Sequence, residues 1–167
     1  MRERLREQRD ALLNAALEYR EDGWSIIPLS PHSKRPLLEK GAVKPFQERI
    51  ATEEEIVGWF EKFNDIALGL VTGKTSDVVV IDCDSDSAIE FARANGLSSP
   101  FSAISGRGPH YYFRHPGPRI PNQTGLTGCD KIDLRGDGGY VVVPPVSYTH
   151  LRAHETDSYL VCRLLLE

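Results

Sequence analysis

The sequence has few cysteines, no long apolar run and no excess of positive charge, and each lack excludes a class of protein. Its three cysteines, Cys83, Cys129 and Cys162, never stand in CxxC spacing, which argues against a zinc site and a disulfide framework. No stretch reaches the roughly 20 apolar residues that a membrane helix needs, and the charged start from Met1 to Arg9 lacks a signal peptide's apolar core. We therefore expect a cytoplasmic protein with reduced thiols and no membrane partner.

The formal net charge of −4 gives no support for a nucleic-acid partner from the chain as a whole. Any contact with DNA must then be local. The basic residues that could make such a contact lie in expected loops or strand ends, and each taken alone is more simply a solvated surface residue: Lys34, Arg35, Lys40, Lys44, Arg107, Arg114 and Arg119. The length of 167 residues and the apolar fraction of 40% predict one globular domain with a buried core.

The segment after residue 145 differs in character from what precedes it. Residues 146–167, VSYTHLRAHETDSYLVCRLLLE, have neither the turn chemistry nor the alternation of the earlier strands. They resemble the conceptual translation of a transposon-type sequencing adaptor; the alternative is a genuine C-terminal helix over LVCRLLL. On the first interpretation residues 1–145 are a truncated native domain. His150, His154 and Cys162 are then excluded from any metal or catalytic site.

Hydrophobic spacing and turn residues predict an α+β fold, with helices packed outside a sheet that dominates the second half. The first expected helix ends at Gly23, the second begins with a capping box of Thr52 and Glu55, and the third ends at Gly96. These helices span residues 3–22, 52–63 and 86–95. Strands are expected over residues 24–29, 66–71, 78–81, 101–104, 109–113, 131–135 and 140–143. We expect two hairpins, one around Gly73 and one around residues 136–139.

The strongest chemical signal is VVVIDCD, residues 78–84. Side chains alternate along a strand, so Asp82 and Asp84 should project from the same face. Two close carboxylates repel unless a cation compensates, which suits Mg²⁺ or Mn²⁺. The motif alone does not decide between such a site and a strand that ends in a polar turn.

A third carboxylate, Asp133, lies in KIDLRGDGGYVVVPP and would complete a metal site. Two-metal phosphoryl transfer needs acidic ligands for both ions. Asp133 alternates with the apolar Ile132 and Leu134 and shares a strand face with Arg135. The alternative interpretation is therefore a surface pair between Asp133 and Arg135.

Between these segments lies SGRGPHYYF, residues 105–113. Glycines at 106 and 108 let the backbone approach a phosphate closely, and His110 could donate a hydrogen bond to a triphosphate. Ser105 precedes Arg107 by two positions in the same flexible entry. A lone histidine is more often structural, which is the alternative for His110.

The segment GLVTGKTS resembles a phosphate-binding P-loop only superficially. The first P-loop glycine would fall at Leu68, and the segment continues into an expected strand where a P-loop must open a helix. We interpret it as a turn and expect no intrinsic ATPase.

Taken in order, VVVIDCD, SGRGPH and KIDLRGDGGYVVVPP resemble the three motifs of the archaeo-eukaryotic primase superfamily. More narrowly, the chain is similar to the bifunctional DNA primase/polymerase N-terminal domain of plasmids, phages and mobile elements. The resemblance runs from about residue 15 to 145 and includes LGLVTG and the earlier residues Tyr19, Gly23, Pro28, Lys34, Arg35, Pro36 and Trp59. It implies a mixed or antiparallel central sheet with an RRM-like catalytic half.

The resemblance also implies the site residues. Asp82, Asp84 and Asp133 would be catalytic ligands of Mg²⁺ or Mn²⁺. His110 would contact the incoming nucleotide, with Ser105, Arg135 and Lys34 as further nucleotide contacts. The implied partners are a DNA template and primer, nucleoside triphosphates, and a helicase domain downstream or in trans.

Two alternatives use the same residues differently. A metal-dependent nuclease would activate water with these carboxylates, and a non-catalytic module would only bind single-stranded DNA. His110 and its glycines have no obvious role in either, which favours nucleotide addition on a DNA template.

Overall fold

The computed structural model describes residues 2–144. They form two units, residues 2–71 with 140–144, and residues 72–139. Within residues 2–144, no helix is long and apolar enough to cross a membrane. The segment 146–167, with His150, His154 and Cys162, lies outside the described residues.

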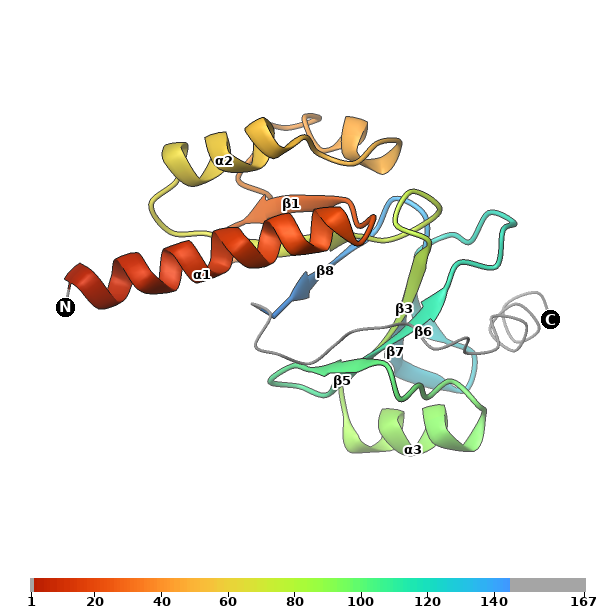
Figure 1. Ribbon diagram of the computed structural model, residues 1–167. Coiled ribbons are helices and arrows are strands. Elements are labelled where there is room, and N and C mark those ends of the chain that lie inside the picture. The colour runs from red at the N-terminus through yellow and green to blue at the C-terminus, as the bar shows by residue number, and fades with distance from the viewer. Residues whose placement is uncertain (1, 145–167) are drawn as a thin grey trace. The chain divides into compact units, whose positions relative to one another are not determined.

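The first unit contains three helices and three strands, drawn in red to yellow and blue in Figure 1. Its strands form an antiparallel sheet in the order β1-β2-β8. The elements are α1 (Arg2–Glu21), β1 (Ile26–Leu29), the 3₁₀ helix η1 (Lys44–Gln47), α2 (Glu53–Lys62), β2 (Ala67–Val71) and β8 (Tyr140–Val143).

The sequence signals at the helix ends are confirmed. Helix α1 ends before Gly23, whose φ of 86° lies in the left-handed region that favours glycine. Helix α2 begins with the predicted capping box, in which Thr52 and Glu55 each accept a hydrogen bond from the other's backbone N–H.

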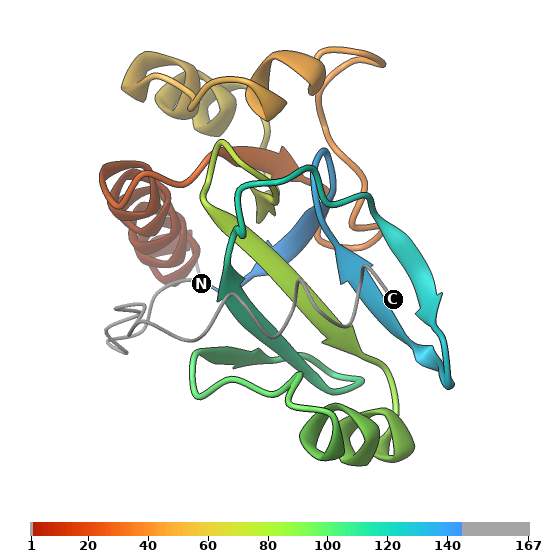
Figure 2. The same cartoon turned by 90° about the vertical axis from the view of Figure 1, so that its right-hand side faces the viewer.

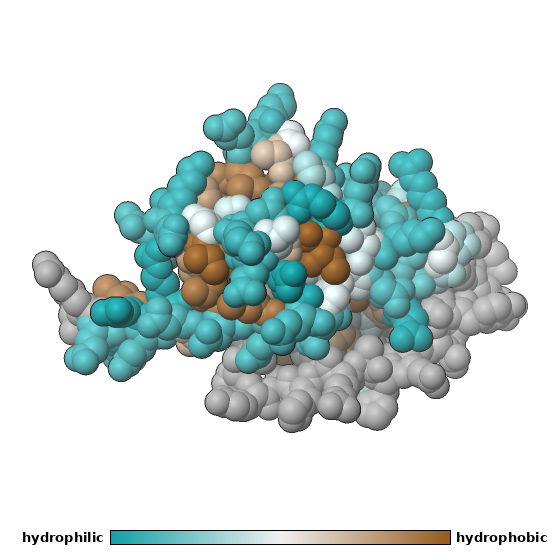
Figure 3. All heavy atoms as spheres, turned by 45° about the horizontal axis from the view of Figure 1, so that its top comes forward, coloured by the Kyte–Doolittle hydropathy of each residue, from teal (hydrophilic) through white to brown (hydrophobic). Residues whose placement is uncertain are grey.

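Helix α1 buries only a narrow stripe near its C-terminal end. Most of the side chains that it shows in Figure 3 are hydrophilic, and its Leu5 is 60% exposed. At the buried end, the Tyr19 hydroxyl donates to the Pro144 carbonyl oxygen at 2.9 Å. Burial, then Asp22 and Glu18, raises the pKa of Tyr19 to about 12. The phenol therefore stays a proton donor at neutral pH and ties α1 to the residue after β8.

The second unit is built on a five-stranded antiparallel sheet in the order β4-β5-β3-β7-β6. The central strand β3 runs between β5 and β7, yellow-green in Figure 2. The elements are β3 (Val78–Cys83), α3 (Asp86–Ala94), β4 (Ser102–Ile104), β5 (Pro109–Arg114), β6 (Gln123–Leu126) and β7 (Cys129–Arg135).

Helix α3 covers one face of this sheet. Ala88 and Ala92 of α3 pack with the odd-numbered residues of β3, Val79, Ile81 and Cys83, all 0% exposed. Each large apolar side chain buried in this way stabilises the fold by about 2 kcal/mol. Because side chains alternate along a strand, the even-numbered residues of β3 project from the opposite face.

The predicted α+β class is confirmed, with both sheets antiparallel, but both predicted hairpins are wrong. Strand β2 pairs with β1 and β8, and β3 pairs with β5 and β7, so β2 and β3 lie in different sheets. Strands β7 and β8 are likewise in different sheets. The two glycine-containing turns are where the chain passes between the units. Strand β6 is absent from the strands expected from the sequence, because its mostly exposed, polar residues give no apolar alternation.

The carboxylate of Asp137 organises the turns of the second unit. It accepts hydrogen bonds from the backbone N–H groups of Lys74 and Ile120, and the His115 ring nitrogen Nε2 lies 3.2 Å from it. Burial alone would raise the pKa of Asp137, but these hydrogen bonds outweigh it and the pKa is lowered. The turn at Gly73 runs directly into β3, as expected for a segment that is not a P-loop.

Candidate active site

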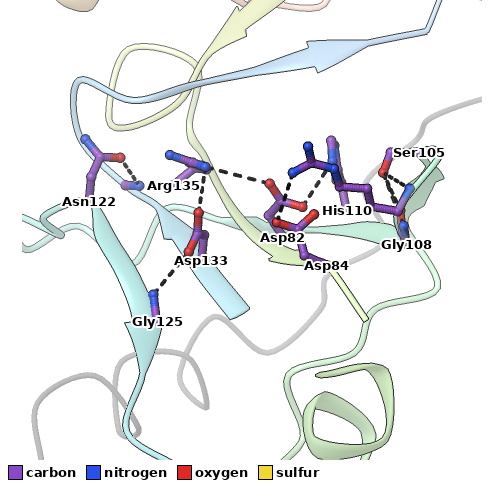
Figure 4. Close-up of polar contacts among 11 residues, drawn as sticks. Asp82, Asp84, Ser105, Gly108, His110, Asn122, Gly125, Asp133 and Arg135 are labelled. Carbon is purple, nitrogen blue, oxygen red and sulfur yellow. Dashed lines mark hydrogen bonds and ion pairs between the residues drawn. The ribbon is translucent and has the colours of Figure 1, made fainter. Parts of the chain in front are cut away.

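Three of the predicted site residues lie in a row across neighbouring strands. In the antiparallel register, Asp82 of β3 is directly opposite His110 of β5 on one side and Asp133 of β7 on the other. Directly opposite residues share a face and have β-carbons about 4.5–5.5 Å apart. The row therefore lies on the face of the sheet opposite α3, and Figure 4 shows its side chains.

Asp82 lies between a histidine and an arginine. Its Oδ1 is 3.2 Å from Nε2 of His110, and its Oδ2 is 3.8 Å from Nη2 of Arg135. The side chains of Asp82 and His110 are only 14% and 11% exposed. Charges at this depth are weakly screened by water, so an ion pair here, which for His110 requires a protonated ring, is stronger than the same pair on the surface.

Asp133 also has a partner for each carboxylate oxygen. Its Oδ2 accepts a hydrogen bond from Nη2 of Arg135 at 2.8 Å, and its Oδ1 accepts one from the Gly125 N–H at 3.1 Å. The pair of Asp133 with Arg135, left open by the sequence, is therefore present. It lies in a half-buried position on the row rather than on the open surface, because the Asp133 side chain is 15% exposed.

Asp84 extends the same face by one step beyond the end of β3. Its backbone N–H donates to the Lys131 carbonyl oxygen at 2.9 Å, which continues the pairing with β7. Its side chain is 30% exposed and its Oδ2 lies 3.8 Å from Nη1 of Arg107. Cys83, between the two aspartates, faces α3. Burial, then Asp82, Cys129 and Asp84, raises the pKa of its thiol to about 11, so it stays protonated at neutral pH.

The donor set suits a hard divalent cation, since carboxylate oxygens are the ligands that Mg²⁺ and Mn²⁺ prefer. The backbone register brings Asp82 and Asp133 within reach of one ion. Over residues 2–144, however, no three His, Cys, Asp or Glu side chains converge closely enough to hold a metal together. Both carboxylate oxygens of Asp133 are engaged, by Arg135 and by the Gly125 N–H. The chemistry of the donor set therefore suits a divalent ion, and a metal role for these residues stays a prediction.

The Ser105–Gly108 turn is closed by its own serine. The Ser105 hydroxyl donates to the Gly108 carbonyl oxygen at 2.8 Å and accepts from the N–H groups of Arg107 and Gly108, both at 3.3 Å. We call Asp82, His110 and Asp133, together with Asp84, the carboxylate row. The Ser105 hydroxyl holds the backbone of the exposed Arg107 at the edge of this row. A direct contact of Ser105 with a nucleotide stays a prediction.

The two glycines of this turn differ in what surrounds them. A β-carbon on Gly108 would run into the Cys83 carbonyl oxygen of β3, whereas one on Gly106 would have no atom within 4 Å. Gly108 is thus needed for the close approach of β5 to the end of β3, between Asp82 and Asp84.

We expect Gly108→Ala to lower the free energy of unfolding by about 1–3 kcal/mol, because backbone atoms must move to admit the methyl group. Gly106→Ala is the matched control, with an expected change within about 0.5 kcal/mol. Denaturant unfolding of both variants measures the difference. Equal stabilities would show that the turn tolerates a side chain at either position.

Lys34 belongs to the first unit, whereas the other predicted site residues belong to the second. It is exposed in the turn after β1 and has a φ of 58°, which is uncommon for a residue with a side chain. Its N–H donates to the Ser30 carbonyl oxygen at 2.8 Å. A phosphate contact for Lys34 stays a prediction.

One contact of the site escaped the sequence analysis. Gly125, with a φ of 71°, lies at a register shift of β6 and offers its N–H to Asp133. The glycine at position 125 is visible in the sequence. The residues around it do not show that its backbone N–H faces the carboxylate of Asp133, eight residues later. Arg107, one of the basic residues named from the sequence, is exposed and its Nη1 lies 3.8 Å from Oδ2 of Asp84.

The comparisons with known proteins bear on the family of the chain. No curated protein matches the chain at a significant level. The model of the family described as bifunctional DNA primase/polymerase, N-terminal, matches residues 16–161. The matched range takes in every residue of the carboxylate row, and it also takes in part of the 146–167 segment. Because the match covers most of the chain and contains the whole row, the protein belongs to the bifunctional DNA primase/polymerase N-terminal family.

Proposed function

We propose that this chain is a catalytic domain that transfers nucleotides from nucleoside triphosphates to a 3′-hydroxyl on a DNA template. The main observation that supports this proposal is the strand register, which places Asp82 between His110 and Asp133 on one face of the sheet. Family membership supports the reaction class. The expected setting is replication of a plasmid, phage or mobile element, with a helicase domain as partner in a longer protein or in trans.

Asp82, Asp84 and Asp133 are the residues that would hold Mg²⁺ or Mn²⁺. A divalent ion bound there would lower the pKa of the attacking hydroxyl and neutralise charge on the triphosphate. Carboxylates from two neighbouring strands offer such an ion ligands on a rigid scaffold, because backbone pairing fixes their spacing.

The remaining side chains suit the binding of a polyanion. His110 is buried, and its contact with Asp82 fixes the ring so that one nitrogen keeps a defined direction. Arg107, 74% exposed on the turn held by Ser105, lies beside Asp84, and Arg135 lies between Asp82 and Asp133, so both place positive charge along the row. These groups would bind and orient a triphosphate beside the carboxylates.

A metal-dependent nuclease remains the second candidate, because the same carboxylates could activate water. A buried histidine beside Asp82 favours nucleotide addition, since a doubly protonated ring would offer a triphosphate a donor that a nuclease does not need. A module that only binds single strands would need neither the histidine nor paired carboxylates.

One assay separates the three functions. We expect the full chain, given an end-labelled primer on a DNA template with Mg²⁺ or Mn²⁺ and nucleoside triphosphates, to lengthen the primer. Shortening of the label without nucleotides would establish the nuclease instead. Binding that weakens steeply with salt, with neither lengthening nor shortening, would establish the binding module.

A further inference from the structure

Arg135 occupies the position between two carboxylates of the row. It follows Asp133 by two residues on β7 and therefore shares its face. Its Nη2 lies 2.8 Å from Oδ2 of Asp133 and 3.8 Å from Oδ2 of Asp82, and dashed lines in Figure 4 join it to both. Its side chain is 34% exposed, so the guanidinium has a path towards solvent.

Removing this guanidinium would leave two acidic groups facing each other across adjacent strands. Like charges directly opposite in a sheet destabilise it, and the effect grows where water is scarce. The side chains of Asp82 and Asp133 are only 14% and 15% exposed. The positive charge of Arg135 therefore compensates a repulsion that the register imposes.

Arg135 contacts one oxygen of each carboxylate, and the other oxygen of each has a different neighbour. Oδ1 of Asp82 faces His110, and Oδ1 of Asp133 accepts the Gly125 N–H. Arg135 contacts Oδ2 of each. A divalent ion held by Asp82 and Asp133 would compete with Arg135 for these carboxylates and would repel its charge.

We propose that Arg135 is a built-in counter-cation of the site, which pairs with Asp82 and Asp133 until a divalent ion displaces it. This inference rests on the proposed function, because it concerns the same metal site. Arg135 lowers the affinity for the ion by competing for its ligands. Once displaced, the guanidinium remains beside the row and is free to pair with a phosphate.

The test is a titration of the full chain with Mn²⁺, in which electron paramagnetic resonance measures the concentration of the free ion. We expect Arg135→Gln to bind Mn²⁺ about tenfold more tightly than the wild type, because a competing unit charge is removed. Arg114→Gln is the matched control. Arg114 ends β5 and pairs with the exposed Asp77 at 3.2 Å, so its loss should leave the affinity unchanged. Unchanged or weaker Mn²⁺ binding by Arg135→Gln would overturn the proposal.

Thermal unfolding gives a second readout that does not depend on activity. In a chelator we expect Arg135→Gln to melt below the wild type, because Asp82 and Asp133 then repel, and saturating Mn²⁺ should remove the difference. Arg135→Lys keeps the charge but loses the planar fork, so its Mn²⁺ affinity should lie between the other two. If Arg135→Gln does not fold in the chelator, Arg135→Lys supplies the test. A Mn²⁺ affinity of Arg135→Lys equal to that of the wild type would then contradict the proposal.

The same titration separates failure of this inference from failure of the proposed function. The metal site itself is wrong if the wild type binds no Mn²⁺, or if it binds no more Mn²⁺ than the variant with asparagine in place of Asp82 and Asp84. If the wild type binds Mn²⁺ in this way and the Arg135 variants bind it equally well, only the counter-cation role is wrong.

Discussion

Replacing Asp82 and Asp84 together by asparagine is expected to reduce metal-dependent primer extension at least about a thousandfold. Asparagine keeps the size of each side chain but removes the negative charge that a divalent ion requires. Asp82 also holds His110 and lies near Arg135, so its loss affects the whole row. The measurement is the initial rate of nucleotide addition at saturating Mg²⁺ and again at saturating Mn²⁺.

The control is a variant with the same loss of charge elsewhere in the same unit. Asp77→Asn with Asp130→Asn changes two exposed aspartates outside the carboxylate row, and we expect full activity. Asp77 has a φ of 52°, which asparagine tolerates well, so the control should fold. Extension at the wild-type rate by the Asp82 and Asp84 variant would end the assignment of these carboxylates as metal ligands.

Replacing His110 by alanine is expected to lower kcat/KM for the nucleotide about a hundredfold. The ring is 11% exposed and its Nε2 lies 3.2 Å from Asp82, so a doubly protonated ring would keep one N–H towards Asp82 and donate the other to a phosphate at little further cost in side-chain ordering. We expect the loss to fall mainly on KM for the nucleotide if the ring binds the triphosphate in the ground state. Steady-state kinetics over a range of nucleotide concentrations measures this split.

The competing role for His110 is to orient Asp82. His110→Asn keeps a hydrogen-bond donor, and we expect it to recover part of the activity. Mn²⁺ binding distinguishes the two roles, because a nucleotide contact predicts unchanged affinity for the ion in His110→Ala. Weaker Mn²⁺ binding with an unchanged KM for the nucleotide would assign His110 to positioning Asp82 alone.

Local signals in the sequence predicted the elements well because their causes are local. The capping box of Thr52 and Glu55 and the left-handed Gly23 each act within one helical turn, and the structure confirms both. The alternation of VVVIDCD likewise fixes which residues share a face, since it depends only on the geometry of one strand. The sequence therefore predicted which site residues share a face within one strand, but not which strands lie side by side.

The pairing of strands was not predictable in the same way. The turns at Gly73 and at residues 136–139 resemble hairpin turns, yet the strands on either side belong to different sheets. The choice of partner depends on which distant edges are available, and β2 has both of its edges paired with β1 and β8. Strand β6 was missed for a related reason, because its four residues owe their strand conformation to β7 rather than to their own pattern.

By itself the sequence determined the α+β class, the helix ends, and the shared face of Asp82 and Asp84, since each depends on residues within a few positions of one another. Only the tertiary structure decided that Asp133 and His110 flank Asp82, and that Arg135 reaches Asp82 as well as its near neighbour Asp133. The physical reason is that these contacts join segments tens of residues apart. Their register is set by antiparallel pairing and by the burial of the opposite face against α3, and no short stretch of sequence encodes either.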